Sequence, residues 1–138
     1  MDLRSLVYTS HAALDLQPTD LELIHRTARE NNALNGVTGL LVFNGTHFLQ
    51  VIEGAESAIN DLLERLRRDR RHAGVEIHDE RTIENRSFPD WSMELVRVES
   101  SYFEAKETIT GRIPATLAPE VRDRIYLFTK AISGTVKL

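Results

Sequence analysis

A glutamine amide lies in the middle of an apolar strand pattern. In the stretch HFLQVI, side chains alternate along the predicted strand, so Phe48, Gln50 and Ile52 share one face. An amide buried there without hydrogen bonds costs on the order of 1–3 kcal/mol. A neighbouring side chain or a ligand must therefore bind Gln50, which makes this residue the first functional candidate.

A tyrosine occupies a similar place on the predicted strand of residues 3–10. Leu6, Tyr8 and Ser10 share one face of that strand, while Val7 and Thr9 lie on the other. Taken alone, Tyr8 is typical of a core tyrosine whose hydroxyl is hydrogen-bonded within the protein.

The composition gives several other chemistries no support. The 138 residues include no cysteine, so there is no disulfide framework, thiol nucleophile or cysteine metal site. The five histidines lack metal-ligand spacing, and no Walker loop or GxGxxG motif is present. The formal charge of -4 argues against nucleic acid as a direct partner. We expect a soluble, cytoplasmic domain, because neither a signal-peptide pattern nor an apolar run of membrane-spanning length is present.

The candidate residues are positioned by a βαββ pattern. A capping-box signature at Thr19 and Glu22 precedes a helical stripe that runs to about Asn31. Two strands follow, over residues 37–43 and 47–52, and the Asn44-Gly45 pair between them predicts a tight hairpin in which both residues take positive φ.

A second βα pattern follows the hairpin. An apolar stripe over residues 59–66 predicts a helix whose end carries arginines at positions 67, 68, 70 and 71, where cations suit the helix dipole. Residues 75–82 and 91–98 are predicted strands, and Pro89 lies in a turn between them. Trp91 and Met93 share a face of the last strand.

The order βαββαββ predicts an α+β fold, a ferredoxin-like sandwich in which two helices cover one face of a mixed five-stranded sheet. We expect residues 1–100 to form this core. Residues 101–138 are expected to form a helical extension that packs on the core or on a partner. Its main helix, residues 119–133, has an apolar stripe that includes Ile125 and Phe128.

This fold hosts many functions, so the site must decide between them. An acylphosphatase-like enzyme would have glycines and an arginine in the loop after the first strand. Here that loop, residues 11–15, reads HAALD, which removes most support for that enzyme.

A set of short motifs occurs in a characteristic order. The set comprises Tyr8-Thr9-Ser10, Asn31-Asn32, GVTGLL in the hairpin, FLQVIEG from Phe48, RDRRH from Arg68, and the Trp91/Met93 pair. Together these motifs resemble a BLUF domain, a blue-light sensor that uses flavin, of the short single-domain type. The resemblance covers about residues 3–98 and leaves the C-terminal extension uncovered.

The resemblance implies a flavin between the two helices, with FAD favoured over FMN or riboflavin. The residues at matching positions would bind it: Ile24 and Leu66 beside the ring, Asn32 at its pyrimidine edge, Gln50, and Asp69, Arg71 and His72 near the ring edge and ribityl chain. Asn31 stands where some members have histidine, so its contact with the flavin can differ. Without the resemblance, Ile24 and Leu66 are typical core residues and the charge run is typical of a solvated helix end.

The resemblance also implies the photochemistry. Tyr8 would give an electron and then a proton to the excited flavin, with Gln50 as the hydrogen-bond bridge between them. The glutamine amide has one acceptor and two donor hydrogens, so its rotation or tautomerisation changes the bond that it makes to the flavin. Ser10, Trp91 and Met93 are at the family's signal-transmission positions. Ordinary sheet packing is the alternative for Trp91 and Met93.

No enzymatic output module is expected in this sequence, so the signal would leave through an unidentified partner protein or through self-association. The rival functions are a flavin-dependent oxidoreductase and a ligand-binding module that is not photoactive. The first would need a nicotinamide fingerprint or a catalytic base, and the second is opposed by the joint presence of Tyr8, Asn32 and Gln50.

Overall fold

The core of the protein is a mixed five-stranded sheet in the order β4-β1-β3-β2-β5. This architecture comes from a computed structural model that describes residues 3–89, 93–98 and 101–133. β1, β3, β2 and β4 pair antiparallel, whereas β5 runs parallel to β2. The strands are β1 (Leu3–Ala12), β2 (Thr38–Phe43), β3 (His47–Ala55), β4 (His72–Ile83) and β5 (Glu94–Arg97).

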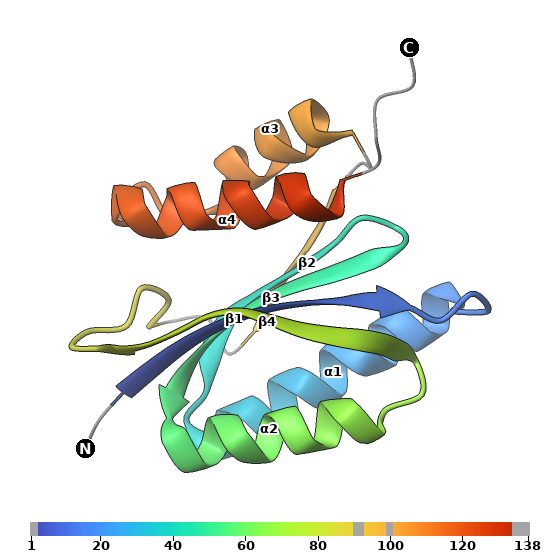
Figure 1. The fold of residues 1–138 in the computed structure, drawn as a ribbon, viewed down its shortest axis with the longest axis horizontal. Helices are drawn as coiled ribbons and strands as arrows, with labels where there is room; N and C mark the ends of the chain where they lie inside the picture. Colours follow the sequence, from blue (N-terminus) through green and yellow to red (C-terminus); the bar gives the residue numbers. More distant parts are fainter. Residues whose placement is uncertain (1–2, 90–92, 99–100, 134–138) are drawn as a thin grey trace.

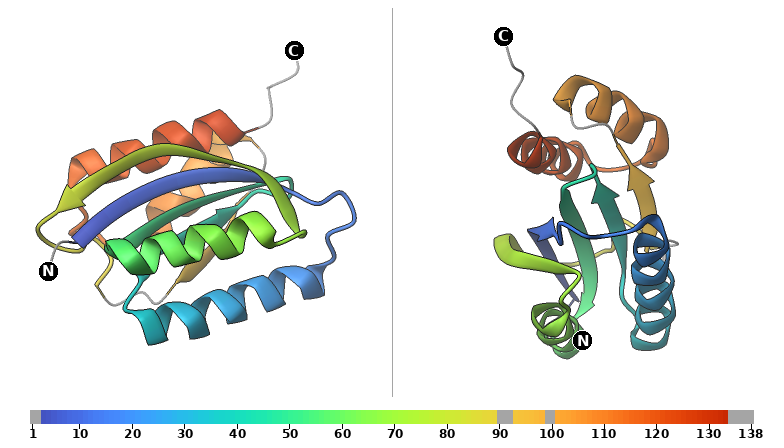
Figure 2. Two further views of the ribbon diagram at one scale, coloured as in Figure 1. Left: turned by 60° about the horizontal axis from the view of Figure 1, so that its bottom comes forward. Right: turned by 90° about the vertical axis from the view of Figure 1, so that its right-hand side faces the viewer.

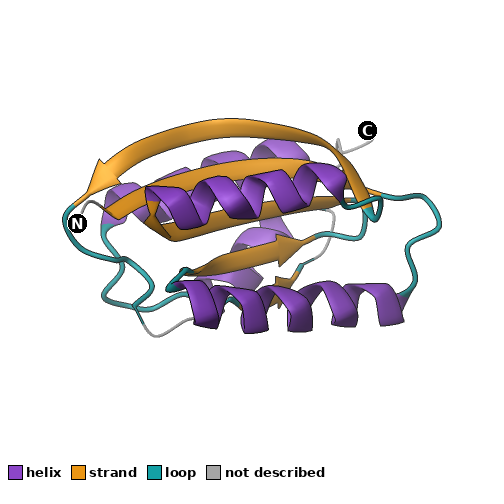
Figure 3. Ribbon diagram, turned by 90° about the horizontal axis from the view of Figure 1, so that it is seen from below, coloured by secondary structure: helices purple, strands orange, loops and turns teal. Residues whose placement is uncertain are grey.

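Helices cover both faces of the sheet (Figure 1). One face carries α1 (Pro18–Asn35) and α2 (Glu56–Arg68), which lie below the sheet in Figure 1 and side by side in the view from below (Figure 3). The opposite face carries α3 (Tyr102–Arg112) and α4 (Pro119–Ile132), as the end-on view of Figure 2 shows. The predicted ferredoxin-like sandwich with a C-terminal helical extension is therefore confirmed. Among the described residues, no helix is both long and apolar enough to cross a membrane.

Alternation along the strands divides the buried residues into two cores. Leu6, Tyr8 and Ile52 pack toward α1 and α2, whereas Val7 and Leu49 pack toward α3 and α4. The face assignments made from the sequence for β1 and β3 are thus correct. As a result, Gln50 faces the first core together with Tyr8.

The first helix differs from its predicted boundaries at both ends. It begins at Pro18, and the backbone N–H of Gln17 donates to Asp20 Oδ2 at 2.9 Å. The predicted capping box at Thr19 and Glu22 is therefore wrong by two positions. The helix also continues past Asn31 to Asn35 and ends at Gly36, whose φ of 68° suits a glycine C-cap.

Two further elements are shorter than predicted. α2 ends at Arg68, so Arg70 and Arg71 lie beyond the helix and not on its last turn. β5 begins at Glu94, so Met93 lies just before the strand and not within it. The prediction for Trp91 lies outside the described residues.

The hairpin turn is wider than the two-residue turn predicted from Asn44-Gly45. Gly45 has a φ of 98°, but Asn44 does not take a positive φ. Asn44 Oδ1 instead accepts the backbone N–H groups of Thr46 at 3.0 Å and His47 at 2.7 Å. The prediction of two positive-φ residues is wrong because the Asn44 side chain caps the turn.

Three contacts hold α4 on the sheet besides its apolar stripe. Near its start, Arg124 forms an ion pair with Asp79 on β4 at 2.9 Å. In its middle, the ring of Phe128 stacks on His78, also on β4, with centroids 4.7 Å apart. At its end, the carbonyl of Ile132 accepts Asn44 Nδ2 at 2.8 Å. The helix therefore contacts both an edge strand and the β2–β3 hairpin.

Candidate functional site

A cavity of about 260 Å³ opens between α1 and α2, against the face of the sheet that these two helices cover. Eight of the residues singled out from the sequence line it: Tyr8, Ile24, Asn31, Asn32, Gln50, Leu66, Asp69 and Arg71. The fold brings them together because α1 and α2 flank the same face that β1 and β3 present. Their individual roles remain predictions at this point.

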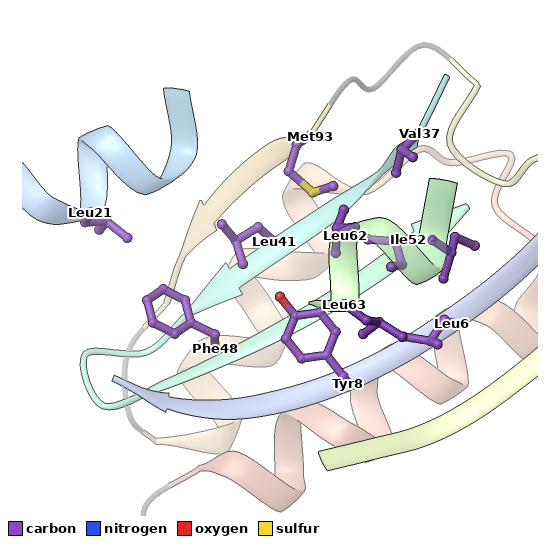
Figure 4. Packing of buried hydrophobic residues seen from close by; sticks show 11 residues of the cluster. Leu6, Tyr8, Leu21, Val37, Leu41, Phe48, Ile52, Leu62, Leu63 and Met93 are labelled. Atoms are coloured by element: carbon purple, nitrogen blue, oxygen red, sulfur yellow. The ribbon is translucent and has the colours of Figure 1, made fainter. Parts of the chain in front are cut away.

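A chain of hydrogen bonds runs along one side of the cavity. Tyr8 and Gln50 are direct cross-strand partners in the β1–β3 ladder, and the Tyr8 hydroxyl donates to Gln50 Oε1. Gln50 Nε2 in turn donates to the Met93 sulfur at 3.1 Å. Figure 4 shows the Tyr8 ring rising from β1 toward Leu41 and Leu62, with Met93 on the segment that leads to β5. The buried amide therefore has both an acceptor role and a donor role in use.

The Tyr8 hydroxyl stays protonated. Burial raises the pKa of Tyr8 far above its usual value near 10, and the nearby Asp69 carboxylate raises it further. The neutral phenol is therefore the hydrogen-bond donor to Gln50 over the whole physiological range.

Met93 is held at Gln50 from its other side as well. His25 Nε2 on α1 lies 2.8 Å from the carbonyl oxygen of Met93. Met93 is buried, with 2% of its surface exposed. A thioether is a weak hydrogen-bond acceptor, so the contact with Gln50 depends on this close placement.

Asn32 has an unsatisfied donor at the cavity. The residue is 1% exposed, and its Nδ2 atom has no hydrogen-bond partner among the residues that the structure describes. Its backbone carbonyl accepts the N–H groups of Gly36 and Val37 in the helix cap, which fixes the residue in the last turns of α1. A buried orphan donor costs about 1–3 kcal/mol, so this position is suited to a ligand that offers an acceptor.

An ion pair forms part of the cavity rim. The Arg71 guanidinium donates from Nε to Asp69 Oδ1 at 2.9 Å and from Nη2 to Oδ2 at 2.7 Å. The hydrogen bond to Asp69 raises the pKa of Arg71, so the guanidinium remains charged. The Arg71 side chain is 34% exposed and that of Asp69 21%, which leaves the pair able to contact a polar part of a ligand.

Some predicted residues lie elsewhere or cannot be placed. Ser10 is buried on β1 and does not line the cavity. His72 begins β4, but its side chain lies outside what the structure describes, as does Trp91. Met93 does not line the cavity, but its sulfur contacts Gln50, which does.

Sequence reasoning missed part of the lining, namely Thr27, Ala28, Leu41, Phe48, Leu62 and Arg65. The apolar members belong to the helix and strand stripes, which are typical of any core, so only the cavity distinguishes them. Arg65 precedes Leu66 on α2 and adds a second cation to the cavity lining. Its adjacency to Leu66 was the one available indication.

The lining matches the chemistry of a flavin. Ile24 on α1 and Leu66 on α2 provide apolar surface for a planar ring, and the Asn32 amide offers a donor for a ring carbonyl. The cations at Arg65 and Arg71 suit the more polar chain attached to such a ring. The residues present therefore fit this cofactor.

Comparison with known proteins places the chain among light sensors. The family model described as BLUF, sensors of blue-light using FAD, matches residues 3–94. The beta subunit of a photoactivated adenylate cyclase from Euglena gracilis is 34% identical over 92 residues, which are 66% of this chain but 11% of that protein. The chain thus spans about a tenth of the length of this curated relative.

Solved structures extend the similarity to nearly the whole chain. BlrB, a BLUF protein in its dark state, is 33% identical with a TM-score of 0.73, and the match covers 94% of this chain and 96% of BlrB. The BLUF structure of BlrP1 is 30% identical with a TM-score of 0.81, and the match covers 100% and 96% of the two chains. The likeness therefore includes the C-terminal helices.

Proposed function

The chain belongs to the BLUF family of blue-light sensors, and from that premise we propose that Tyr8 and Gln50 convert light absorption into a rearranged hydrogen-bond network around FAD. The observation that carries the proposal is the chain from the Tyr8 hydroxyl through the Gln50 amide to the Met93 sulfur, beside the cavity. The BLUF domain is a sensor module, and we propose that this chain catalyses no reaction itself.

The cofactor would be held by residues from both helices. Asn32 would donate its unpaired Nδ2 hydrogens to a ring carbonyl, with Asn31 beside it, while Ile24 and Leu66 would enclose the ring. Asp69, Arg71 and His72 would bind the ring edge and the ribityl chain. FAD is favoured over FMN and riboflavin because the family description names it.

A bound flavin would supply the absorption of blue light and, when excited, the acceptor of one electron. Tyr8 would be the donor: its phenol would give an electron and then its hydroxyl proton to the flavin, with Gln50 as the hydrogen-bond bridge, and would regain both when the electron returns. Because the phenol ends unchanged, the lasting change lies in the Gln50 amide. Rotating or tautomerising this amide changes which of its ends donates.

Rotation of the amide has a consequence for Met93. If the Gln50 amide turns over, Oε1 takes the place of Nε2 beside the Met93 sulfur, which lies 3.1 Å from Nε2. Oxygen and sulfur are both acceptors, so the stabilising contact is lost. Met93 would therefore move, and it directly precedes β5.

The absorption spectrum of the flavin-loaded protein tests this function. A new donor to a flavin carbonyl lowers the excited-state gap, so blue light should produce a red-shifted spectrum that returns in the dark. Turnover of NADH would favour the oxidoreductase, and failure to take up added flavin would favour the ligand-binding module. Either result would contradict the proposal.

The signal would pass from Met93 through β5 to the C-terminal helices. Leu95 packs with the core between the sheet and the helices α1 and α2, whereas Val96 packs with Ile125 of α4 on the opposite face. β5 thus contacts both cores. We propose that movement of Met93 biases α4 between docked and loosened states.

Hydrogen exchange in the dark and under blue light measures this bias. We expect altered protection of the backbone amides in β5 and α4, because hydrogen exchange reports local opening. Each tenfold change in the ratio of docked to loosened α4 corresponds to about 1.4 kcal/mol. The same measurement on a photo-inactive Gln50→Leu variant is the control. Identical exchange in both states, with the flavin shifted, would show that α4 is a static lid or a dimer seam.

The output partner is proposed from the relatives. The Euglena relative is a subunit of an adenylate cyclase, in which the matching region is a small part of the protein. We propose that this chain acts in the cytoplasm on a separate effector protein or through a second copy of itself, without direct contact to nucleic acid or membrane.

A further inference from the structure

A buried carboxylate on the far side of the sheet is not used by the photochemistry described above. Glu53 lies on β3, three residues after Gln50, and is 1% exposed. Because side chains alternate between the two faces of a strand, Glu53 lies on the face opposite to Gln50. A buried glutamate needs strong hydrogen bonds, since an unpaired charge in the interior is very costly. Its partners therefore indicate what it is for.

Glu53 binds the loop that leads to Met93. Its Oε2 atom accepts the backbone N–H of Ser87 and its Oε1 atom that of Phe88, both at 2.8 Å. Hydrogen bonds to a carboxylate are about twice as strong as neutral ones. Phe88 is itself 1% exposed and packs in the core under α3 and α4. Both carboxylate oxygens thus fix the same short stretch of backbone.

Arg86 adds a second set of bonds to the same loop. Its guanidinium donates to the Gly36 carbonyl at 2.7 Å, to Thr38 Oγ1 at 2.9 Å and to the Glu53 carbonyl at 3.0 Å. These acceptors lie at the start of β2 and near the end of β3. We call Glu53 and Arg86 together the loop clasp.

We infer that Glu53 is a positioning residue for the photoreaction: by fixing the loop at Ser87 and Phe88, it holds Met93 where the sulfur accepts Gln50 Nε2. Met93 follows the clasp by a few residues; on its other side the His25 contact and the start of β5 hold its backbone. A weak thioether acceptor orients an amide only when its position is fixed. The clasp therefore sets the resting orientation of Gln50, and this role rests on the proposed function.

A methyl NMR experiment on the protein without flavin tests the positioning directly. The chain has two methionines, Met1 and Met93, so methyl-labelled methionine gives two resonances, and Met93→Leu assigns them. Glu53→Gln replaces one acceptor oxygen by a donor amide, which leaves one loop N–H without a partner. We expect the Met93 methyl and the Gln50 side-chain amide resonances to shift and broaden.

Matched variants complete the test. Glu64→Gln removes an exposed carboxylate that pairs with Arg68 and should leave both resonances unchanged. Arg86→Met weakens the clasp without touching a buried charge, and should reproduce the shift if Glu53→Gln does not fold. Unchanged Met93 and Gln50 resonances in a folded clasp variant would overturn the inference. This arm needs neither flavin nor light, so it is independent of the proposed function.

The flavin-loaded protein gives the second readout. Glu53→Gln should change the rate of dark recovery in the parent protein but have no further effect in a Met93→Leu background, because the residue acts through Met93. An equal change in both backgrounds would mean that Glu53 affects only overall stability.

Discussion

Replacing Gln50 by leucine is expected to abolish the light-induced spectral shift while the protein keeps its fold and its flavin. The loss should be complete, because this amide hydrogen-bonds both the Tyr8 hydroxyl and the Met93 sulfur, and leucine can make neither bond. Flavin affinity should fall by about tenfold or less, since one amide contact contributes about 0.5–1.5 kcal/mol. Stability should fall by about 1–3 kcal/mol, because the buried Tyr8 hydroxyl loses its acceptor. Absorption spectra and thermal unfolding measure these effects.

The matched control for this variant is Gln17→Leu. Gln17 is the other glutamine of the chain; it lies exposed before the first turn of α1 and does not line the cavity. It should show the parent photocycle. A reversible red shift of normal size in Gln50→Leu would remove this residue from the mechanism.

Replacing Tyr8 by phenylalanine should also prevent formation of the usual lit state. The ring keeps its place in the core, whereas the hydroxyl that donates to Gln50 and would supply the proton is lost. The buried phenol has a raised pKa, so in the parent protein the light response should persist at alkaline pH where an exposed tyrosine ionises, near 10. Transient absorption after a blue pulse measures the yield in both proteins.

Tyr126→Phe is the control for Tyr8→Phe. Tyr126 lies on α4, and its hydroxyl is hydrogen-bonded to Thr110 on α3, so the same atom is removed far from the site. The lit-state yield should be unchanged in this variant. If Tyr8→Phe formed the same lit state with the same yield, Tyr8 would be a packing residue.

The order of strands and helices was predictable because the spacing of apolar residues changes clearly along the chain between the strand and the helix pattern. Alternation in residues 3–10 and 47–52 assigned the correct faces to Tyr8 and Gln50, and the stripe of residues 59–66 assigned α2. The turn was not predicted, because Asn44 Oδ1 caps it by accepting the N–H groups of Thr46 and His47, while Asn44 Nδ2 bonds to the carbonyl of Ile132, which is distant in the sequence. The start of α1 was missed because the Asp20 carboxylate accepts the backbone N–H of Gln17, which is the N-cap residue in place of Thr19.

The site was predictable where residue type and position carry information, and not where tertiary contacts decide. Eight residues named from the sequence line one cavity, because motif order fixes their places on the strands and helices. The hydrogen bond from Gln50 to the Met93 sulfur depends on the position of Met93 in space, which no local sequence pattern specifies. Arg65 and the buried Glu53 resemble surface charges in the sequence, and only the packing distinguishes them.

The central claim is that light changes the hydrogen bonds of the Gln50 amide, and infrared difference spectroscopy with labelled glutamine measures this directly. The chain has two glutamines, so a Gln17→Leu background with isotope-labelled glutamine leaves Gln50 as the only labelled amide. We predict an isotope-sensitive amide band in the light-minus-dark spectrum that persists after the electron has returned to Tyr8 and decays with the red shift. A red-shifted flavin without any change in the labelled band would contradict the account.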